Sequence, residues 1–328
     1  MILARVADSF YWMNRYLERV AHTARLLELQ LERLPSSPAQ EIAAGWRRIF
    51  HSLGTRPPGA EIYGGPEDED AFFFADGYTL TDYLSFEAAN AASIIFCLTA
   101  ARENARQVRD SLSNAIWSSL NREYLRLRAT SLVDVWEREP VMLYRAIGEA
   151  VQLFDGVCAS AMRRDAGWHF MRVGRFIERA QLIAALIGAH AKDSAEEEND
   201  WTGLLQGCHA FETYCHLHGA QISGAEVINF LAYDPEFPYS LRFAVDRLRG
   251  SLEVIDPPVR GRSPAEPHDI AGRLDDLLSR QTAIDLTAGG RGEKELTEFI
   301  DLGWKFHEAL ERTYVYYPTE ARVSGERT

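Results

Sequence analysis

Helical periodicity runs through almost the whole chain, whereas the alternation of apolar and polar residues that marks a strand is nearly absent. Apolar residues recur every three or four positions, and short stretches rich in Gly, Pro or acidic residues interrupt them. The clearest interruptions span residues 54–70, 192–200, 255–269 and 287–292. The pattern therefore predicts roughly ten to twelve helices and an all-α fold, built as a large multi-helix bundle.

These helices are expected to form one domain over residues 1–318. A chain of 328 residues is long enough to bury a large hydrophobic core. The last residues, 319–328, are polar and carry no apolar stripe, so we expect a disordered tail.

One helical segment occurs twice along the chain. The segment from Phe10 to Val20 matches the segment from Phe170 to Ala180 at a constant offset of 160 residues, in charged and apolar positions alike. The corresponding charges are Arg15, Glu18 and Arg19 in the first copy and Arg175, Glu178 and Arg179 in the second. The repeat predicts a bundle with two related halves.

The first copy places its charges opposite an apolar stripe. The stripe consists of Met13, Tyr16, Leu17, Val20, Ala24, Leu27 and Leu31. One interpretation is a solvated polar face, on which pairs such as Glu18 with His22 contribute about 0.2–0.5 kcal/mol each. However, Tyr11 and Trp12 share the charged face, where a solvated helix is normally polar.

The second copy indicates burial more strongly, because apolar residues surround its charges on every side. Met171, Leu182 and Leu186 lie beside the charges, and Phe176 and Ile177 cover the other face. A helix that is apolar all round is buried, and buried charges persist only when they are paired and hydrogen-bonded. Each arginine of this helix therefore needs a carboxylate or another anion.

A third helix, from Thr99 to Ser113, carries related chemistry in a different register. The three segments together supply seven arginines, Arg15, Arg19, Arg102, Arg106, Arg109, Arg175 and Arg179, against four acids, Glu18, Glu103, Asp110 and Glu178. Two interpretations remain open. The charges form a buried network that fixes the register of the helices, or the surplus arginines hold a phosphate, an acyl phosphate or a peptide carboxylate. Only the second interpretation predicts a cleft.

With these motifs the chain resembles the Alpha-E family, a helical family named for its Glu-Arg motif. The matching stretches are Trp12–Arg19, Arg102–Arg106, Arg175–Ala180 and Phe230–Ser240, and the resemblance covers about residues 1–315. Two positions depart from the family pattern. Asn14 stands where glycine is usual, and Tyr239 stands where arginine is usual.

The resemblance implies partner proteins but no particular reaction for this chain. Proteins of this family resemble partners of circularly permuted ATP-grasp ligases and transglutaminase-like proteases, beside which they are encoded or to which they are fused. We therefore expect an accessory or co-catalytic partner in amide-bond formation or peptide modification, with an arginine cluster that binds an anionic substrate. The expected anion-binding residues are Arg15, Arg19, Arg102, Glu103, Arg106, Arg109, Arg175 and Arg179.

Two other functions remain as alternatives. In the first alternative, the chain is a stand-alone enzyme of unassigned chemistry, with Glu18 or Glu178 as general acid or base. Alternatively, it is a scaffold whose cluster is purely structural.

Composition and charge narrow the range of partners. The net charge of −13 argues against a protein that coats nucleic acid or an anionic membrane. The longest weakly polar run, residues 88–101, is too short to span a bilayer, and the N-terminus lacks the features of a secretory leader, so we expect a cytoplasmic protein. Because 32 of the 35 basic residues are arginine, the composition is compatible with internal ion pairs or an anion site.

Other chemistry receives little support, and we expect no metal and no cofactor. The segment from Cys208 to His218 gathers His and Cys, but its ligand spacing is not that of a structural zinc site. Glu18 with His22 is an i, i+4 pair, whereas di-iron bundles use i, i+3. The glycine-rich segment 289–292 lacks the preceding strand and the Gly-Lys-Ser/Thr ending of a P-loop.

Overall fold

The computed structural model describes residues 3–59, 72, 76–137, 139–193, 198–257, 263–279 and 291–315, and all regular secondary structure within these ranges is helical. The all-α prediction is confirmed. The helices are α1 (Ala4–Arg33), α2 (Ala39–Ser52), α5 (Gly77–Ser85), α6 (Ile94–Gln107), α7 (Asn114–Arg128), α8 (Leu132–Trp136), α9 (Pro140–Ala161), α10 (Ala166–Asp193), α11 (Glu198–Gly207), α12 (Phe211–His218), α13 (Gly224–Tyr233), α14 (Leu241–Ile255), α15 (Glu266–Ser279) and α16 (Arg291–Leu310). A 3₁₀ turn, η1 (Arg109–Ser111), follows α6, and a π-helical turn, η2 (Glu311–Val315), follows α16.

The predicted interruptions overlap residues that lie outside the described ranges, as does the predicted tail at 319–328. The neighbouring helices reach into the interruptions, since α10 continues to Asp193 and α15 already begins at Glu266. Of the glycine-rich segment, residues 289 and 290 are outside the described part of the chain.

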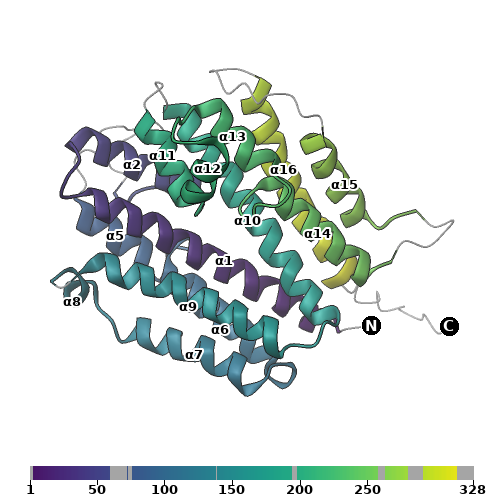
Figure 1. Ribbon diagram of the computed structural model, residues 1–328. Helices are drawn as coiled ribbons and strands as arrows, with labels where there is room; N and C mark the ends of the chain where they lie inside the picture. Colours follow the sequence, from purple (N-terminus) through teal and green to yellow (C-terminus); the bar gives the residue numbers. More distant parts are fainter. Residues whose placement is uncertain are drawn as a thin grey trace, which may run out of the picture.

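The two helices that carry the repeated motif are the centre of the fold. Figure 1 shows α1 and α10 crossing in the middle of the molecule, and they pack against each other more extensively than any other pair. Helices α6 and α9 cover the outer side of α1, with α7 beyond them, and α14 and α16 cover α10. The relation between the copies is established for these two helices, whereas two related halves of the whole bundle are not confirmed.

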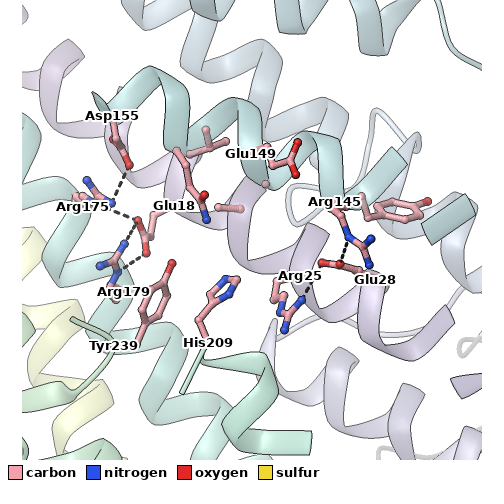
Figure 2. A pocket seen from close by; sticks show the side chains of 15 residues that line it. Glu18, Arg25, Glu28, Arg145, Glu149, Asp155, Arg175, Arg179, His209 and Tyr239 are labelled. Carbon is pink, nitrogen blue, oxygen red and sulfur yellow. Dashed lines mark hydrogen bonds and ion pairs between the residues drawn. The ribbon is translucent and has the colours of Figure 1, made fainter. Parts of the chain in front are cut away.

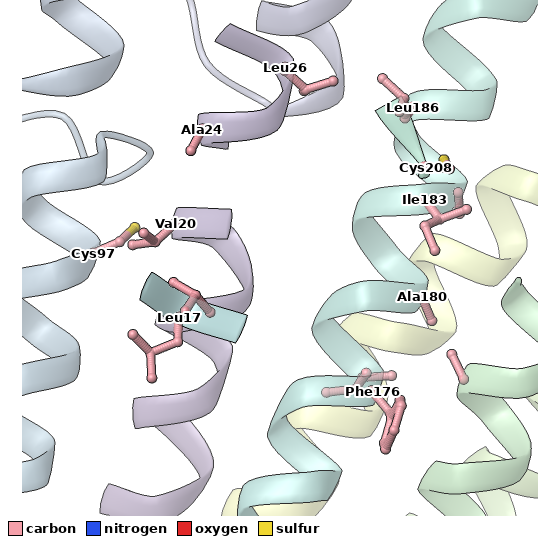
Figure 3. Close-up of a cluster of buried hydrophobic side chains, with 14 of the residues drawn as sticks. Leu17, Val20, Ala24, Leu26, Cys97, Phe176, Ala180, Ile183, Leu186 and Cys208 are labelled. Carbon is pink, nitrogen blue, oxygen red and sulfur yellow. The ribbon is translucent and has the colours of Figure 1, made fainter. Parts of the chain in front are cut away.

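Several apolar residues of the central helices face away from their shared interface. In Figure 3, Val20 of α1 points toward Cys97 of α6, and Ala180 and Ile183 lie on the side of α10 that faces the later helices. These side chains are fully or almost fully buried. Because burial of apolar surface holds each central helix to its outer neighbours, the charged faces of α1 and α10 are left to meet between them.

Candidate functional site

Glu178 of α10 is held by two arginines of α1. Its Oε2 accepts a hydrogen bond from Nε of Arg15 at 2.5 Å, and its Oε1 accepts one from Nε of Arg19. Arg15 is completely buried and also donates to the Tyr11 hydroxyl and to the amide oxygen of Gln181. Each guanidinium nitrogen of Arg15 therefore has an acceptor, as a buried cation requires.

Glu18 of α1 is held in turn by two arginines of α10. Its Oε1 and Oε2 accept hydrogen bonds from Nε and Nη2 of Arg179 at 2.5 and 3.0 Å, and Nε of Arg175 lies 3.4 Å from Oε2. Arg179 makes a third hydrogen bond, from Nη1 to the carbonyl oxygen of Pro238. The two copies thus exchange partners, since each helix supplies the carboxylate for the arginines of the other.

Each carboxylate has one buried arginine and one arginine that reaches solvent. Arg15 and Arg179 are the buried members, whereas Arg19 and Arg175 keep 22% and 29% of their side-chain surface exposed. The exposed residue is the second arginine of the motif in α1 but the first in α10. The two clusters are therefore related without being copies, and they open on different cavities.

A glycine allows the helices to approach closely enough for this exchange. A Cβ atom added to Gly174 of α10 would lie 2.1 Å from the backbone carbonyl oxygen of Tyr11 in α1. One added to Gly167 would lie 2.7 Å from the ring of Phe10. Real Cβ atoms essentially never come so close, so the α1–α10 interface depends on the missing side chain of Gly174.

The arginines keep the central carboxylates ionised. Burial alone would raise the pKa of Glu18, but Arg179 and Arg175 outweigh that effect and hold the pKa below its usual value of 4.5. The pKa of Glu178 is lowered in the same way, with Arg15 and Arg19 opposing the effect of burial. Both residues therefore act as permanent anions at neutral pH.

The third arginine segment does not join this centre, which corrects the expectation that all three segments meet. The face of α6 that packs on α1 is made of fully buried Cys97, Ala101 and Ala105, so its charged residues point elsewhere. Arg102 donates to Asn121 of α7 and to Glu103, and Arg106 also pairs with Glu103.

Arg109 lies near this separate α6–α7 cluster rather than at the centre. It donates to the carbonyl of Leu112 and to Asn114. Its guanidinium carbon lies 5.6 Å from the ring of Trp117, and that of Arg102 lies at the same distance. Contacts with the Trp117 ring and local hydrogen bonds therefore hold Arg102 and Arg109 in this cluster.

A cleft of about 250 Å³ opens beside Glu18, between α1, α9 and α10 and the residues before α12 and α14; we call it the Arg175 cleft. It is lined by Glu18, Ala21, Arg25, Glu28, Tyr144, Arg145, Gly148, Glu149, Val151, Gln152, Asp155, Arg175, Arg179, His209 and Tyr239. Figure 2 shows a charged group at each end of the cleft, around Glu18 and around Glu28. Of the residues predicted for the site, this cleft brings together Glu18, Arg175 and Arg179.

Asp155 of α9 is a site residue that the sequence analysis missed. Its Oδ2 lies 2.7 Å from Nη2 of Arg175. Burial raises the pKa of Asp155 to about 6, an effect that Arg175 reduces and Glu18 reinforces. The available signal was a lone carboxylate within the apolar run from Val151 to Cys158.

The other end of the cleft is a second ion-pair group. Glu28 of α1 accepts hydrogen bonds from Nη1 of Arg25 at 3.0 Å and from Nε of Arg145 of α9 at 2.9 Å. Arg145 also donates to Glu32. Glu18, Arg25 and Glu28 recur at intervals of seven and three residues, so one face of α1 runs along the cleft.

The wall opposite α9 is aromatic. Tyr239 lies under the guanidinium of Arg179, whose carbon is 4.2 Å from the ring centroid. His209 packs against Tyr239 with ring centroids 5.2 Å apart, and it adopts a left-handed backbone with φ of 52°. The ring of Tyr239 thus covers the cation of Arg179 on this wall of the cleft.

The remaining candidate chemistry finds no support among the described residues. In that part of the chain no group of three or more His, Cys, Asp or Glu residues is arranged to hold a metal ion. Cys208 is buried, whereas His216 and His218 are exposed on α12. A search of the described helices finds none long and apolar enough to cross a membrane.

Comparison with known proteins gives a family and a set of uncharacterised relatives. The model of the Alpha-E family, described as a predicted alpha-helical domain with a conserved ER motif, matches residues 2–315. An uncharacterised protein of Mycobacterium bovis is 27% identical over 263 residues, and one of Mycobacterium tuberculosis is 26% identical over the same length. The matched region is 76% of this chain but only 30% of each relative. No solved structure shows a significant match.

Proposed function

This chain belongs to the Alpha-E family, and from that premise we propose that it is an accessory or co-catalytic partner of an ATP-grasp amide ligase and a transglutaminase-like protease, holding an anionic substrate in the Arg175 cleft. The observation that carries the proposal is the cleft itself, which opens directly on one of the two Glu-Arg clusters. A purely structural network has no need of such an opening.

Arg175 is the residue proposed to receive the anion. Its Nε faces Oε2 of Glu18 at 3.4 Å without a hydrogen bond, its Nη2 contacts Asp155, and about a third of its side chain is exposed. Arg179, by contrast, already has an acceptor for Nε, Nη1 and Nη2. A bound carboxylate would give the exposed part of the Arg175 guanidinium a further acceptor.

The balance of charge favours a ligand with a single carboxylate over a polyanion. The four arginines of the lining, Arg25, Arg145, Arg175 and Arg179, face four acids, Glu18, Glu28, Glu149 and Asp155. A polyphosphate would meet these carboxylates at close range, whereas the end of a peptide or amino acid presents one negative group. This ligand class agrees with the amide chemistry implied by the proposed partners.

The comparisons support a role beside other protein domains. The chain spans about a third of the length of its mycobacterial relatives, so a region of this kind exists there within a much larger polypeptide. Glu18 and Glu178, the acid or base candidates of the stand-alone enzyme, are unsuited to proton transfer because arginines lower the pKa of both. Asp155, with a pKa of about 6, is the better candidate for that alternative.

A pair of glycine variants tests ligand binding. Gly148 and Gly156 both lie on α9 with no atom of the described residues within 4 Å of an added Cβ, but only Gly148 lines the cleft. Titration calorimetry with the dipeptide alanyl-alanine should show saturable binding to the wild type and to Gly156→Met. Gly148→Met should weaken binding about tenfold or more by filling the cleft. Equal binding by both variants would show that the dipeptide does not bind in the Arg175 cleft.

Co-purification tests the partnership separately. The tagged chain, expressed at native levels in its own cells, is recovered and its companions are identified by mass spectrometry. An ATP-grasp or transglutaminase-like protein in near-stoichiometric amount is expected. Recovery of the bare chain would overturn the accessory role, even if the calorimetry had shown a ligand.

A further inference from the structure

A second and larger cavity lies on the other Glu-Arg cluster. It has a volume of about 570 Å³, and we call it the Arg19 cavity. Its lining includes Arg19, Thr23, Glu178, Gln181, Leu182 and Trp304. None of these residues lines the Arg175 cleft, so the two openings are separate sites.

The polar end of the Arg19 cavity has unused hydrogen-bonding capacity. Arg19 directs Nε and Nη2 at Glu178, while its Nη1 makes no hydrogen bond to another described residue. Thr23 lies one helical turn after Arg19 on the same face of α1. The Thr23 hydroxyl and the amide nitrogen of Gln181 are buried, and neither has a hydrogen-bond partner in the described part of the chain.

The orientation of Gln181 follows from its other contact. Its amide oxygen accepts a hydrogen bond from Nη2 of Arg15, which fixes the amide nitrogen as the donor that remains without an acceptor. A buried donor without an acceptor destabilises the folded chain. Arg19, Thr23 and Gln181 are therefore three neighbouring donors for which a ligand oxygen would be an acceptor.

The rest of the cavity wall is largely apolar. Leu182 and Ala185 come from α10, and Ile300 and Trp304 come from α16. Trp304 is 50% exposed, which is unusual for so large an apolar side chain. Among the described residues of the lining, Arg19 and Glu178 are the only Arg, Lys, Asp or Glu, whereas the described lining of the Arg175 cleft has eight.

We propose that the Arg19 cavity binds a second ligand of a different class, an apolar molecule or chain end that carries one carboxylate. The carboxylate contacts Arg19, with Thr23 and Gln181 beside it, and the apolar body lies along α10 and α16 against Trp304. Glu178 holds Arg19 in place from the opposite side. This assignment does not rest on the function proposed for the Arg175 cleft.

The test uses 4-phenylbutanoate and its neutral amide as probes in titration calorimetry with the full chain. The acid should bind saturably to the wild type, and the amide should bind about tenfold more weakly because it lacks the charge that Arg19 recognises. Ala185→Phe fills the apolar part of the cavity, and Arg19→Met removes the polar contact. Each should weaken binding of the acid about tenfold or more.

Two controls separate loss of the site from loss of the fold. Melting temperatures of Ala185→Phe and Arg19→Met are measured alongside, and Ala185 is partly exposed, which leaves space for the larger ring. Gly148→Met, which fills the Arg175 cleft, should bind the acid as the wild type does. Absence of saturable binding, equal binding of acid and amide, or undiminished binding by a folded Ala185→Phe would each overturn the proposal.

Discussion

Arg179 of α10 donates two parallel hydrogen bonds to Glu18 of α1, from Nε to Oε1 at 2.5 Å and from Nη2 to Oε2 at 3.0 Å. Both side chains are almost fully buried. A planar guanidinium can satisfy both carboxylate oxygens at once, and in a buried site each oxygen left without a donor carries a desolvation cost. The pair therefore fixes the register of the two central helices as well as neutralising both charges.

Arg179→Lys should show that geometry matters beyond charge. Lysine keeps the positive charge but lacks the planar guanidinium with its several N–H donors. One oxygen of Glu18 and the carbonyl of Pro238 therefore lose their donors. We expect the free energy of unfolding to fall by about 1–3 kcal/mol in chemical denaturation. Arg126→Lys is the matched control, because Arg126 makes the same two-point contact with Glu123 on the exposed face of α7. That change should cost about 0.5 kcal/mol or less, and equal losses would refute the argument.

Gly174→Ala should be strongly destabilising. The added methyl group meets the backbone oxygen of Tyr11, which cannot rotate away, so α1 and α10 must separate and stretch the four ion pairs between them. We expect a loss of about 3 kcal/mol, at the upper end of the usual cost of overpacking.

Gly188→Ala on the same helix is the control for Gly174→Ala. In the part of the chain that the structure describes, nothing lies within 4 Å of its added Cβ, and removing a helical glycine should stabilise the protein by about 0.5–1 kcal/mol. Comparable melting temperatures for the two variants would show that the close approach is unimportant.

The sequence predicted the helical class and the burial of Glu178 and Arg179, whereas Arg175, expected to be buried with them, keeps 29% of its side-chain surface exposed. Apolar residues surround Glu178 and Arg179 along the sequence of this helix, so both charges were expected to be buried and paired. The exchange of partners across the repeat was not predictable, because it depends on how the two helices cross. That crossing depends on Gly174, whose partner atom is a backbone oxygen with no signature in the sequence.

The cleft was harder to predict than the charges. The third arginine segment has the same residue types as the first two. However, the small residues Ala101 and Ala105 pack toward α1, so the arginines of α6 lie on another face of the helix. Asp155 and Arg145 come from α9, which carries no Glu-Arg motif, and reach the cleft only through tertiary packing. Composition gives the kinds of charge available, whereas the packing of α9 decides which of them face one another.

Asp155 should make binding at the Arg175 cleft depend on pH. Above its pKa of about 6 the carboxylate is ionised, pairs with Arg175 and repels an incoming anion. Below that pH it is neutral and releases Arg175. Affinity for alanyl-alanine, whose carboxyl group titrates near pH 3.5 and whose amino group titrates near pH 8, should therefore rise several-fold, up to about tenfold, as the pH falls from 7 to 5.

Asp155→Asn separates this effect from general changes with pH. The amide cannot ionise, so the variant should bind at pH 7 about as tightly as the wild type does at pH 5. A wild-type affinity that does not vary between these pH values would show that Asp155 does not compete for Arg175.

His22 should contribute to destabilisation in mild acid. It is buried on α1 close to Glu18, and burial lowers its pKa to about 4, from the 6.5 of an exposed histidine, although Glu18 and Glu178 oppose the shift. Between pH 6.5 and 4 the unfolded chain therefore binds a proton that the folded chain does not, so stability falls as pH falls through this window. The full effect of the shift is about 3 kcal/mol.

The measurement is the slope of the unfolding free energy against pH for the wild type, His22→Gln and His216→Gln. Asp155 acts in the opposite direction over an overlapping range, since its raised pKa makes the folded chain bind the extra proton, so the wild-type curve alone does not isolate His22. His22→Gln should have the shallower slope, whereas His216→Gln, which changes an exposed histidine of α12, should follow the wild type. Identical slopes for all three would mean that the pKa of His22 is the same in the folded chain as in the unfolded one.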